Sequence, residues 1–422
     1  MVSKVSKEKI DSKDPRFIPE VNIGLVGHVD HGKTTLVESL TGKWTDTHSE
    51  EKKRGITIRL GYADATFYRC ASCKEKGSPG WANSPKCPSC FADTEPARTV
   101  SFVDAPGHST LMATVLSGAS IMDGALLLVS AAEKCPQPQT AEHLIALDIV
   151  GIRNIVIVQN KIDAVDEKRA RESYEEIKKF VKGTVAENAP IIPVSALQQI
   201  NIDALIDAIQ ETIPTPKRDP SKDPVMYIAR SFDVNKPGTP YDKLSGGVLG
   251  GSLVQGILHA GDEIEIRPGI ERGGKWTPMK TSVTGLQKVG NDLEEAGPGG
   301  LLGASTKLDP FLTKADSFAG QVAGRPGKLP PVHNKVLMNV SLLEKMVETN
   351  EPVKPINTNE ALMMTCAVAK TAGVVTSSRK EGKEIEVALK LPICADYGDK
   401  VALSRLHQNR WRLIGYGVLK KG

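Results

Sequence analysis

Short apolar runs alternate with amphipathic stretches through the first half of the chain. The apolar runs have the length of buried strands and read NIGLV, SFVDA, GALLLVS, NIVIVQN and IIPVS. The amphipathic stretches repeat apolar residues at helical spacing and read LMATVLSGASIM, PQTAEHLIALDIV, EKRARESYEEIKKFV and NIDALIDAIQETI. This alternation predicts a mostly parallel sheet with helices on both faces, in an α/β domain over residues 21–213.

The pattern changes at the proline-rich segment PTPKRDPSKDP, residues 214–224, which we expect to be a linker. Beyond it, β-type runs such as VMYIARSF, GGVLGGSLVQGIL and DEIEIRP are separated by glycine and proline turns, as is typical of an antiparallel barrel. A second cluster of such residues, GRPGKLPPV, indicates the start of another unit of the same kind. We therefore expect a tail at residues 1–20 and two antiparallel β-barrel domains at residues 225–325 and 326–422.

Composition agrees with several ordinary globular domains. The chain has 422 residues, of which 40% are hydrophobic and 25% charged, and domains usually hold about 100 to 150 residues each. A formal net charge of +4 is small for this length, so nucleic-acid binding has to be argued from local features. The sequence shows neither a secretory signal nor an apolar run of the ~20 residues that a membrane helix needs, which predicts a cytoplasmic protein with no membrane partner.

The residues after the first apolar run match the phosphate-loop pattern G-x-x-x-x-G-K-[ST] at every fixed position. Glycines allow a tight turn that directs successive N–H groups at a phosphate, and the N-terminus of the following helix adds positive charge. We expect Lys33 to reach the outer phosphates, the Thr34 hydroxyl to bind Mg²⁺ and Thr35 to donate to the inner phosphate. The alternative is a glycine turn that binds nothing. The nucleotide-binding candidates here are Gly27, His28, Val29, Asp30, His31, Gly32, Lys33, Thr34 and Thr35.

Asp30 keeps two interpretations. Its carboxylate either helps to hold the metal ion or accepts hydrogen bonds from backbone N–H groups of the same loop. The sequence does not choose between these two roles.

A second motif supplies the carboxylate that a magnesium nucleotide requires. In SFVDAPGH an apolar run delivers Asp104 at its end, where parallel sheets bind ligands. We expect Asp104 to be a magnesium partner and the Gly107 N–H to contact the γ-phosphate. Taken alone D-x-P-G is a common turn, and its position after a phosphate loop is what favours the functional interpretation.

Two further segments indicate the base. A carboxylate can only accept, so Asp163 of the sequence NKID can pair with the N1–H and amino group of guanine, and adenine offers no such pair of donors. We expect Asn160 to tie the loop together, Lys161 to lie against the ring and the Ala196 N–H to serve the guanine carbonyl. The nucleotide is therefore predicted to be GTP or GDP. The candidates in these segments are Asn160, Lys161, Asp163, Ser195, Ala196 and Leu197.

Four of the seven cysteines are paired by spacing. They form C-x₂-C, a gap of thirteen residues and a second C-x₂-C, which suits a tetrahedral structural Zn²⁺ site in an insert over residues 70–90. A reducible disulfide pair or an iron site are the alternatives. The candidate zinc ligands are Cys70, Cys73, Cys87 and Cys90.

Together, the phosphate loop, RGITI, DAPGH, NKID and SAL resemble the translational GTPases of the elongation factor Tu group. The resemblance implies that the fold is an α/β P-loop GTPase domain followed by two antiparallel β-barrels. It also implies that Thr57 binds Mg²⁺ in the GTP state and that His108 orients the attacking water, with Val29 and Ile56 beside it. A histidine that caps the following helix is the alternative for His108. Arg54 is the nearest candidate for an arginine finger and a weak one, so slow intrinsic hydrolysis is expected.

Longer stretches narrow the resemblance. HSEEKKRGITIRLGYAD, CPQPQTAEHL, RSFDVNKPGTP, GGVLGGSLVQG, LDPFLTKAD and WRLIGYG look like the gamma-subunit family of archaeal and eukaryotic translation initiation factor 2. This resemblance implies a heterotrimer with alpha and beta subunits that carries initiator methionyl-tRNA to the small ribosomal subunit in the GTP state and releases it after hydrolysis. The sequence departs from the family at Ser109 and Thr110, where an acidic residue is usual after the histidine.

Three other functions compete with this one. A selenocysteine-specific or Tu-type elongation factor shares the fold but does not normally carry a four-cysteine insert at this position. A GTP-regulated scaffold that does not handle RNA fits the small net charge. A metabolic GTPase shares the GTPase signature and lacks the later barrel motifs.

Overall fold

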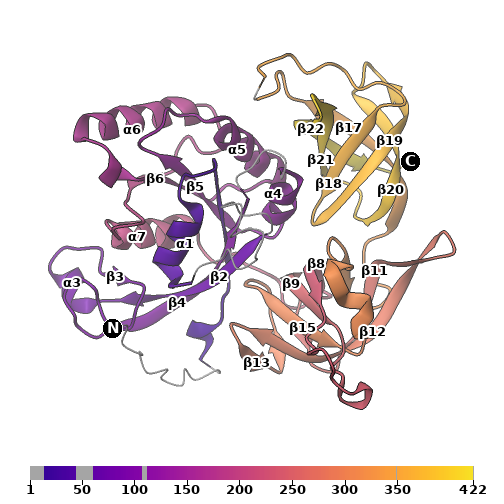
Figure 1. Cartoon of the computed structure of the whole chain (residues 1–422), viewed down its shortest axis with the longest axis horizontal. Coiled ribbons are helices and arrows are strands. Elements are labelled where there is room, and N and C mark those ends of the chain that lie inside the picture. The colour runs from indigo at the N-terminus through magenta and orange to yellow at the C-terminus, as the bar shows by residue number, and fades with distance from the viewer. Residues whose placement is uncertain (1–13, 44–59, 107–111, 348, 422) are drawn as a thin grey trace.

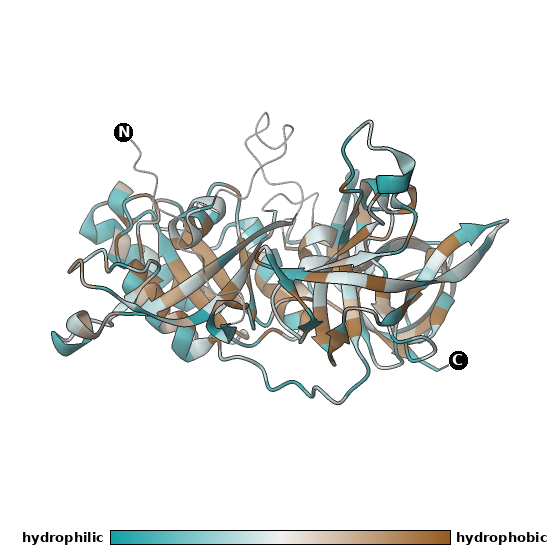
Figure 2. Ribbon diagram, turned by 90° about the horizontal axis from the view of Figure 1, so that it is seen from below, coloured by the Kyte–Doolittle hydropathy of each residue, from teal (hydrophilic) through white to brown (hydrophobic). Residues whose placement is uncertain are grey.

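A computed structural model describes residues 14–43, 60–106, 112–347 and 349–421. Figure 1 shows an α/β domain in indigo and purple beside two β-barrels, one in orange and one in yellow. In Figure 2 the brown, hydrophobic positions gather on the strands, and teal positions cover the outer helices and loops. No helix within these described ranges has the length and apolar character that crossing a membrane requires.

The first domain is built on one seven-stranded sheet with the order β3-β2-β4-β1-β5-β6-β7. Strands β4, β1, β5, β6 and β7 run parallel, and β2 pairs antiparallel with both β4 and β3. The strands are β1 (Asn22–Gly27), β2 (Gly61–Arg69), β3 (Trp81–Ala82), β4 (Glu95–Asp104), β5 (Gly124–Ser130), β6 (Ile155–Asn160) and β7 (Ile191–Pro193).

Helices cover both faces of this sheet, as the sequence predicts. On one face α1 and α7 pack against the strands, and on the other face α4, α5 and α6 do so. The helices are α1 (Lys33–Thr41), α3 (Ala71–Glu75), α4 (Met112–Ala119), α5 (Pro138–Val150), α6 (Glu167–Val181) and α7 (Ile202–Thr212), with short 3-10 turns η1 (Pro15–Phe17) and η3 (Ile162–Ala164).

The second domain is an antiparallel barrel. Its strands pair in the order β11-β16-β8-β9-β15-β12, and an additional pairing of β11 with β12 closes the ring. The elements are β8 (Val225–Phe232), η4 (Tyr241–Lys243), β9 (Val248–Gln255), β10 (Leu258–His259), β11 (Glu263–Arg272), β12 (Lys275–Lys288), β13 (Asn291–Leu293), β14 (Glu295–Ala296), β15 (Leu302–Thr306), η5 (Pro310–Asp316) and β16 (Val322–Gly324).

The third domain is a closed six-stranded antiparallel barrel with the order β17-β20-β19-β18-β21-β22. Its strands are β17 (Val332–Leu342), β18 (Ala361–Cys366), β19 (Ala369–Arg379), β20 (Glu384–Cys394), β21 (Lys400–His407) and β22 (Arg410–Lys420). The fold expected from the sequence, one α/β domain and two β-barrels, is therefore confirmed.

The barrels pack directly on the α/β domain. Ala402 and Leu413 of the third domain lie in the same buried cluster as the apolar side chains of α4 and α5. The second domain is joined to the first by a hydrogen bond from Asn22 Nδ2 to Ser252 Oγ at 2.9 Å, and the segment between the two domains is held to the first by an ion pair between Arg218 and Asp123. These contacts place both barrels against the domain that carries the phosphate loop.

Candidate functional site

The phosphate loop connects the C-terminal end of β1 to the N-terminus of α1. Its backbone enters the left-handed region at Asp30 (φ 61°) and at Gly32 (φ 88°), where the helix begins. The Lys33 ammonium group donates to the carbonyl of Gly27 at 3.0 Å and to that of His28 at 2.6 Å, so this side chain folds back over the loop. The loop therefore has the curvature that lets N–H groups and one lysine surround a phosphate.

Two oxygen-bearing side chains meet at the edge of the loop. The Thr34 hydroxyl on α1 donates to Asp104 Oδ2 at the end of β4 over 2.9 Å, and Asp104 is buried. A hydroxyl and a carboxylate are ligands that Mg²⁺ accepts, and Mg²⁺ usually takes few protein ligands beside the phosphates of its nucleotide. These residues therefore fit a magnesium nucleotide. Asp30 is exposed and stays a candidate for either of its two roles.

Asn160 joins the phosphate loop to the predicted base-binding segments. Its Nδ2 donates to the His31 carbonyl at 2.9 Å, and its Oδ1 accepts from the Ala196 N–H at 3.0 Å. The side chain is buried at the end of β6 and bridges residues 129 and 36 positions away in sequence. In this structure the Ala196 N–H thus contacts Asn160, and its pairing with a guanine carbonyl stays a prediction.

The remaining base-site candidates lie around this bridge. Lys161 takes a left-handed conformation (φ 63°), and Asp163 is exposed on η3 directly after it. The Ser195 hydroxyl accepts from the Gln198 N–H at 3.1 Å and closes the turn that holds Ala196. Leu197 is 73% exposed at that turn. The segments that Asn160 joins to the phosphate loop therefore expose one carboxylate, that of Asp163, and one apolar side chain, that of Leu197.

Sequence reasoning missed His143, which contacts the loop from α5. The Gly27 N–H donates to His143 Nδ1 at 2.8 Å, and the ring is 1% exposed. Burial, reinforced by the neighbouring Lys33, His28 and His31, lowers the pKa of His143 to about 3. The available signal was a histidine inside the amphipathic stretch PQTAEHLIALDIV, which by pattern alone is an ordinary helix residue.

Glu133 is a second residue that the sequence did not indicate. Its Oε2 lies 3.6 Å from His31 Nε2, and His31 Nδ1 lies 2.9 Å from the Leu128 carbonyl. Because a carbonyl only accepts, Nδ1 carries a proton and donates it. Burial lowers the pKa of His31 to about 4, although the Leu128 carbonyl and Glu133 favour the protonated form.

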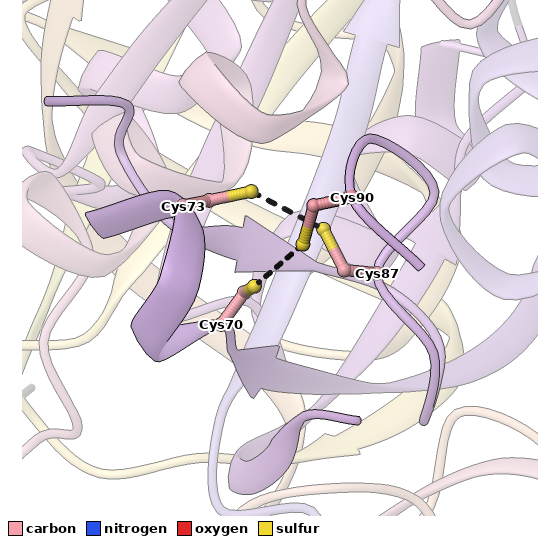
Figure 3. A group of neighbouring side chains, drawn as sticks. All are labelled: Cys70, Cys73, Cys87 and Cys90. Atoms are coloured by element: carbon pink, nitrogen blue, oxygen red, sulfur yellow. Dashed lines mark hydrogen bonds between the residues drawn. The ribbon is translucent and has the colours of Figure 1, made fainter. Parts of the chain in front are cut away.

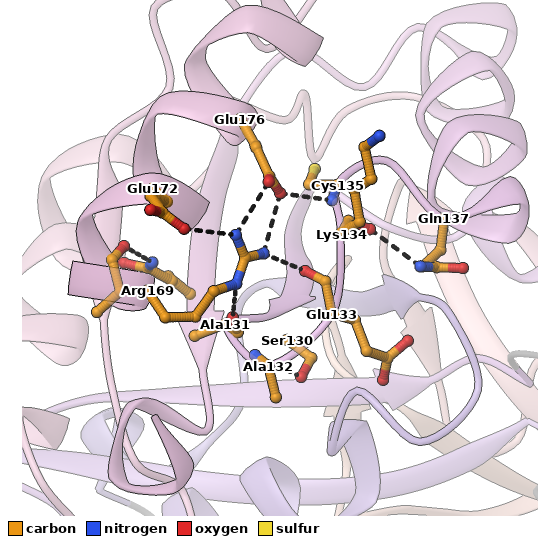
Figure 4. A network of polar contacts seen from close by, with 12 residues as sticks. Ser130, Ala131, Ala132, Glu133, Lys134, Cys135, Gln137, Arg169, Glu172 and Glu176 are labelled. Atoms are coloured by element: carbon orange, nitrogen blue, oxygen red, sulfur yellow. Dashed lines mark hydrogen bonds and ion pairs between the residues drawn. The ribbon is translucent and has the colours of Figure 1, made fainter. Parts of the chain in front are cut away.

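An arginine on α6 holds the segment that carries Glu133 (Figure 4). Arg169 donates to the carbonyl of Ala131 at 3.2 Å and to that of Glu133 at 2.8 Å, and it pairs with Glu176 at 2.9 Å. Glu176 in turn accepts from the Cys135 N–H at 2.8 Å. The side-chain hydrogen bonds of Arg169 lower the pKa of Glu176 against the opposing effect of burial. This network fixes the loop between β5 and α5 beside the phosphate loop.

Three predicted site residues lie outside the described residues. They are Thr57, Gly107 and His108, and the neighbouring Arg54 and Ile56 lie outside as well. Their roles stay predictions.

The four cysteines of the insert converge as their spacing predicts (Figure 3). Cys70 Sγ lies 3.4 Å from Cys90 Sγ, Cys73 Sγ lies 3.5 Å from Cys87 Sγ, and all four sulfurs are within 4.8 Å of one another. Tetrahedral Zn–S bonds of about 2.3 Å put sulfurs roughly 3.8 Å apart, which these separations approach. The thiolate set therefore fits Zn²⁺.

The insert is docked on the α/β domain by its own polar contacts. Trp81 Nε1 donates to Asp207 Oδ1 on α7 at 2.6 Å, and Asn83 Nδ2 donates to the Ser39 carbonyl on α1 at 2.7 Å. The Arg69 guanidinium lies 3.7 Å from the centre of the Trp81 ring. A metal that orders the four cysteines would thus also fix the surface that meets α1 and α7.

Comparisons with known proteins agree with this architecture. Residues 19–215 match the elongation factor Tu GTP binding domain family, and residues 334–419 match the family described as initiation factor eIF2 gamma, C terminal. Among solved structures, a bacterial selenocysteine-specific elongation factor superposes with a TM-score of 0.71 at 24% identity, covering 95% of this chain and 58% of that one. An elongation factor SelB from Methanococcus maripaludis, solved with the GTP analogue GppNHp, has a TM-score of 0.70 at 22% identity, covering 96% of this chain and 80% of that chain. At these identities the likeness concerns the fold.

Relatives at higher identity are more specific. The translation initiation factor 2 subunit gamma of Methanocaldococcus jannaschii is 58% identical over 95% of this chain and 97% of its own length. The protein of the same description from Halobacterium salinarum is 60% identical over 95% of this chain and 97% of its own length. With a GTP-binding domain of the elongation factor Tu type at its N-terminal end, the chain belongs to the family of translation initiation factor 2 gamma subunits.

Proposed function

We propose that this chain is a GTP-controlled carrier of methionylated initiator tRNA. In the GTP state it binds this tRNA and brings it to the small ribosomal subunit, and GTP hydrolysis releases it. It acts as the gamma subunit of a heterotrimer with alpha and beta subunits. The proposal rests on the family, since initiation factor 2 gamma subunits match 95% of the chain.

The Asn160 bridge is the observation that supports binding of a guanine nucleotide. One buried side chain bonds both the phosphate loop and the Ala196 turn, so the two halves of a nucleotide site are held in fixed relation. The exposed carboxylate of Asp163 follows three residues later. Carboxylate pairing with two guanine donors then selects GTP over ATP.

Thr34 and Asp104 hold Mg²⁺ in this proposal, and Thr57 joins them in the GTP state. When bound there, Mg²⁺ would supply positive charge that offsets the negative charge of the phosphates. In the same proposal the Lys33 ammonium group reaches the outer phosphates, and the Gly107 N–H contacts the γ-phosphate. His108 orients the attacking water. Hydrolysis is slow in the isolated protein, because no arginine is identifiable as an arginine finger and Arg54, the nearest candidate, is a weak one.

The cysteine insert has a structural role in this proposal. Four thiolates close the tetrahedral shell of Zn²⁺ and leave no position for a substrate. The insert therefore fixes the surface around Trp81 and takes no part in hydrolysis.

The decisive experiment measures tRNA binding by the purified chain, with and without its partner subunits, in GTP and in GDP. Initiator methionyl-tRNA is compared with methionylated elongator tRNA by filter binding. Preference for the initiator that weakens in GDP supports the proposal. If the chain with its partner subunits bound both tRNAs equally, and did so equally in GTP and in GDP, the result would contradict the proposal and favour a GTP-regulated scaffold.

A base-exchange experiment tests the nucleotide assignment separately. Asp163→Asn replaces an acceptor by a group that also donates, so GTP affinity should fall and xanthosine triphosphate should bind better. Glu167→Gln on the exposed start of α6 is the matched control, since it removes a nearby carboxylate without touching the base. Retained preference for guanine in Asp163→Asn would contradict the assignment of Asp163.

A further inference from the structure

The first glycine of the phosphate loop is held from outside the loop. Gly27 is the last residue of β1, and its N–H donates to Nδ1 of His143, which lies 116 positions later on α5. A backbone N–H can only donate, so Nδ1 must carry the lone pair. The ring is therefore neutral, with its proton on Nε2.

Gly27 is also constrained on its other sides. Its φ is 142°, and a Cβ added there would lie 2.5 Å from the Leu128 carbonyl oxygen, so the backbone runs close against β5. Its own carbonyl accepts from Lys33 Nζ at 3.0 Å. The N–H held by His143 and the carbonyl held by Lys33 together determine the direction in which the chain leaves the sheet and starts the phosphate loop.

We propose that His143 is a positioning residue for nucleotide binding: its neutral imidazole accepts the Gly27 N–H and sets the orientation of the phosphate loop. The ring does not touch the nucleotide and acts through Gly27 alone. This inference rests on the proposed function, in which the loop is part of the GTP site. It gives α5 a part in nucleotide binding, although none of the nucleotide-binding motifs lies on that helix.

The surroundings favour the required form of the ring. The Lys33 ammonium group and the imidazoles of His28 and His31 are neighbours, so a proton on Nδ1 would place a second buried positive charge near that of Lys33. Such a proton would also remove the acceptor for Gly27. Burial therefore keeps the His143 ring neutral, which is the form that the positioning role requires.

The competing explanation is that His143 merely fills space in the core of α5. Three variants separate the two explanations. His143→Asn retains an acceptor near the position of Nδ1 and leaves a void, and His143→Ala leaves a larger void and no acceptor. Leu147→Ala, at a fully buried residue one turn further along α5, creates a void but leaves the acceptor of the Gly27 N–H in place.

The experiment measures GDP and GTP affinity by fluorescence titration of the full chain, with thermal unfolding in parallel. We expect His143→Ala to weaken both nucleotides about tenfold, the effect of one lost buried hydrogen bond. His143→Asn should recover affinity to within about threefold of the unsubstituted protein while its unfolding temperature stays low. Leu147→Ala should lose stability and keep its affinity. Equal loss of affinity in His143→Ala and Leu147→Ala, or no recovery in His143→Asn, would overturn the proposal.

The tautomer of His143 gives a readout that does not depend on nucleotide binding. Long-range ¹H–¹⁵N correlation spectra at neutral pH should show His143 protonated at Nε2 only, and a ring protonated at Nδ1 would overturn the inference. If the unsubstituted protein bound no guanine nucleotide while His143 showed the expected tautomer, the assignment of the GTP site would fail. The contact of His143 with Gly27 would still stand.

Discussion

Replacing Asn160 by alanine should damage the nucleotide site more than any other single change at the end of β6. The side chain is 2% exposed and makes two hydrogen bonds, to the His31 carbonyl at 2.9 Å and from the Ala196 N–H at 3.0 Å. Its removal leaves one buried acceptor and one buried donor without their partner in this side chain. Each such group costs about 1–3 kcal/mol, so the free energy of unfolding of the α/β domain should fall by about 2–6 kcal/mol.

Affinity for GDP should fall as well, because one of the two bonds orders the phosphate loop. A loss of about 1.4 kcal/mol from this bond alone corresponds to a tenfold weaker complex. The measurements are urea unfolding without nucleotide and titration with a fluorescent GDP analogue, on the full chain with Mg²⁺ present in the titration.

Gln159→Ala provides the matched control. Gln159 precedes Asn160 on the same strand, is also 2% exposed, and donates to the Ala170 carbonyl of α6 at 2.7 Å, on the side away from the phosphate loop. It should lower stability by about 1–2 kcal/mol and leave GDP affinity nearly unchanged. If the two variants weakened GDP equally, or if Asn160→Ala bound GDP normally, the bridge would have no role in nucleotide binding.

Three further predictions concern the metal, the pH and the hydrolysis step. Cys73→Ser should reduce bound zinc from one equivalent to none by elemental analysis and lower the unfolding temperature, and unchanged zinc content would contradict a four-thiolate site. His143 has its pKa depressed to about 3, so its contribution to stability is complete above about pH 6.5 and is lost as pH falls toward 3, at up to about 1.4 kcal/mol per pH unit. Acid unfolding of His143→Asn should show a shallower slope in that window, and an identical slope would exclude this residue as the cause. His108→Ala should keep GTP affinity and lower stimulated hydrolysis, and an unchanged stimulated rate would remove its assigned role.

The sequence by itself determined the features that depend on near neighbours. The phosphate loop could be recognised because its glycines and lysine are needed at fixed spacing within eight residues. The alternation of apolar runs and amphipathic stretches gave the α/β domain, since strand and helix periodicity are local properties. The same holds for the paired cysteines, because each C-x₂-C forms half of a metal site within one turn.

Strand β2 shows where this local information ends. One face of this strand carries the small residues Ala63 and Ala65, and the other carries Tyr62 and Tyr68, of which Tyr62 also packs against a buried cluster, so the contrast between the two faces is weak. The sequence pattern did not indicate this strand, and pairing with β4 decided its place in the sheet.

Only the tertiary structure decided which distant residues support the site. His143 on α5 and Glu133 after β5 reach the phosphate loop from positions about 100 or more residues away, and Asn160, which the sequence did place in the site, bonds His31 across a similar distance in sequence. No spacing rule specifies such contacts, because they depend on how helices pack across a sheet and on which buried polar groups must find partners. The motifs thus identify the chemistry of the site, and the packing of α5 and β6 determines how that chemistry is held in place.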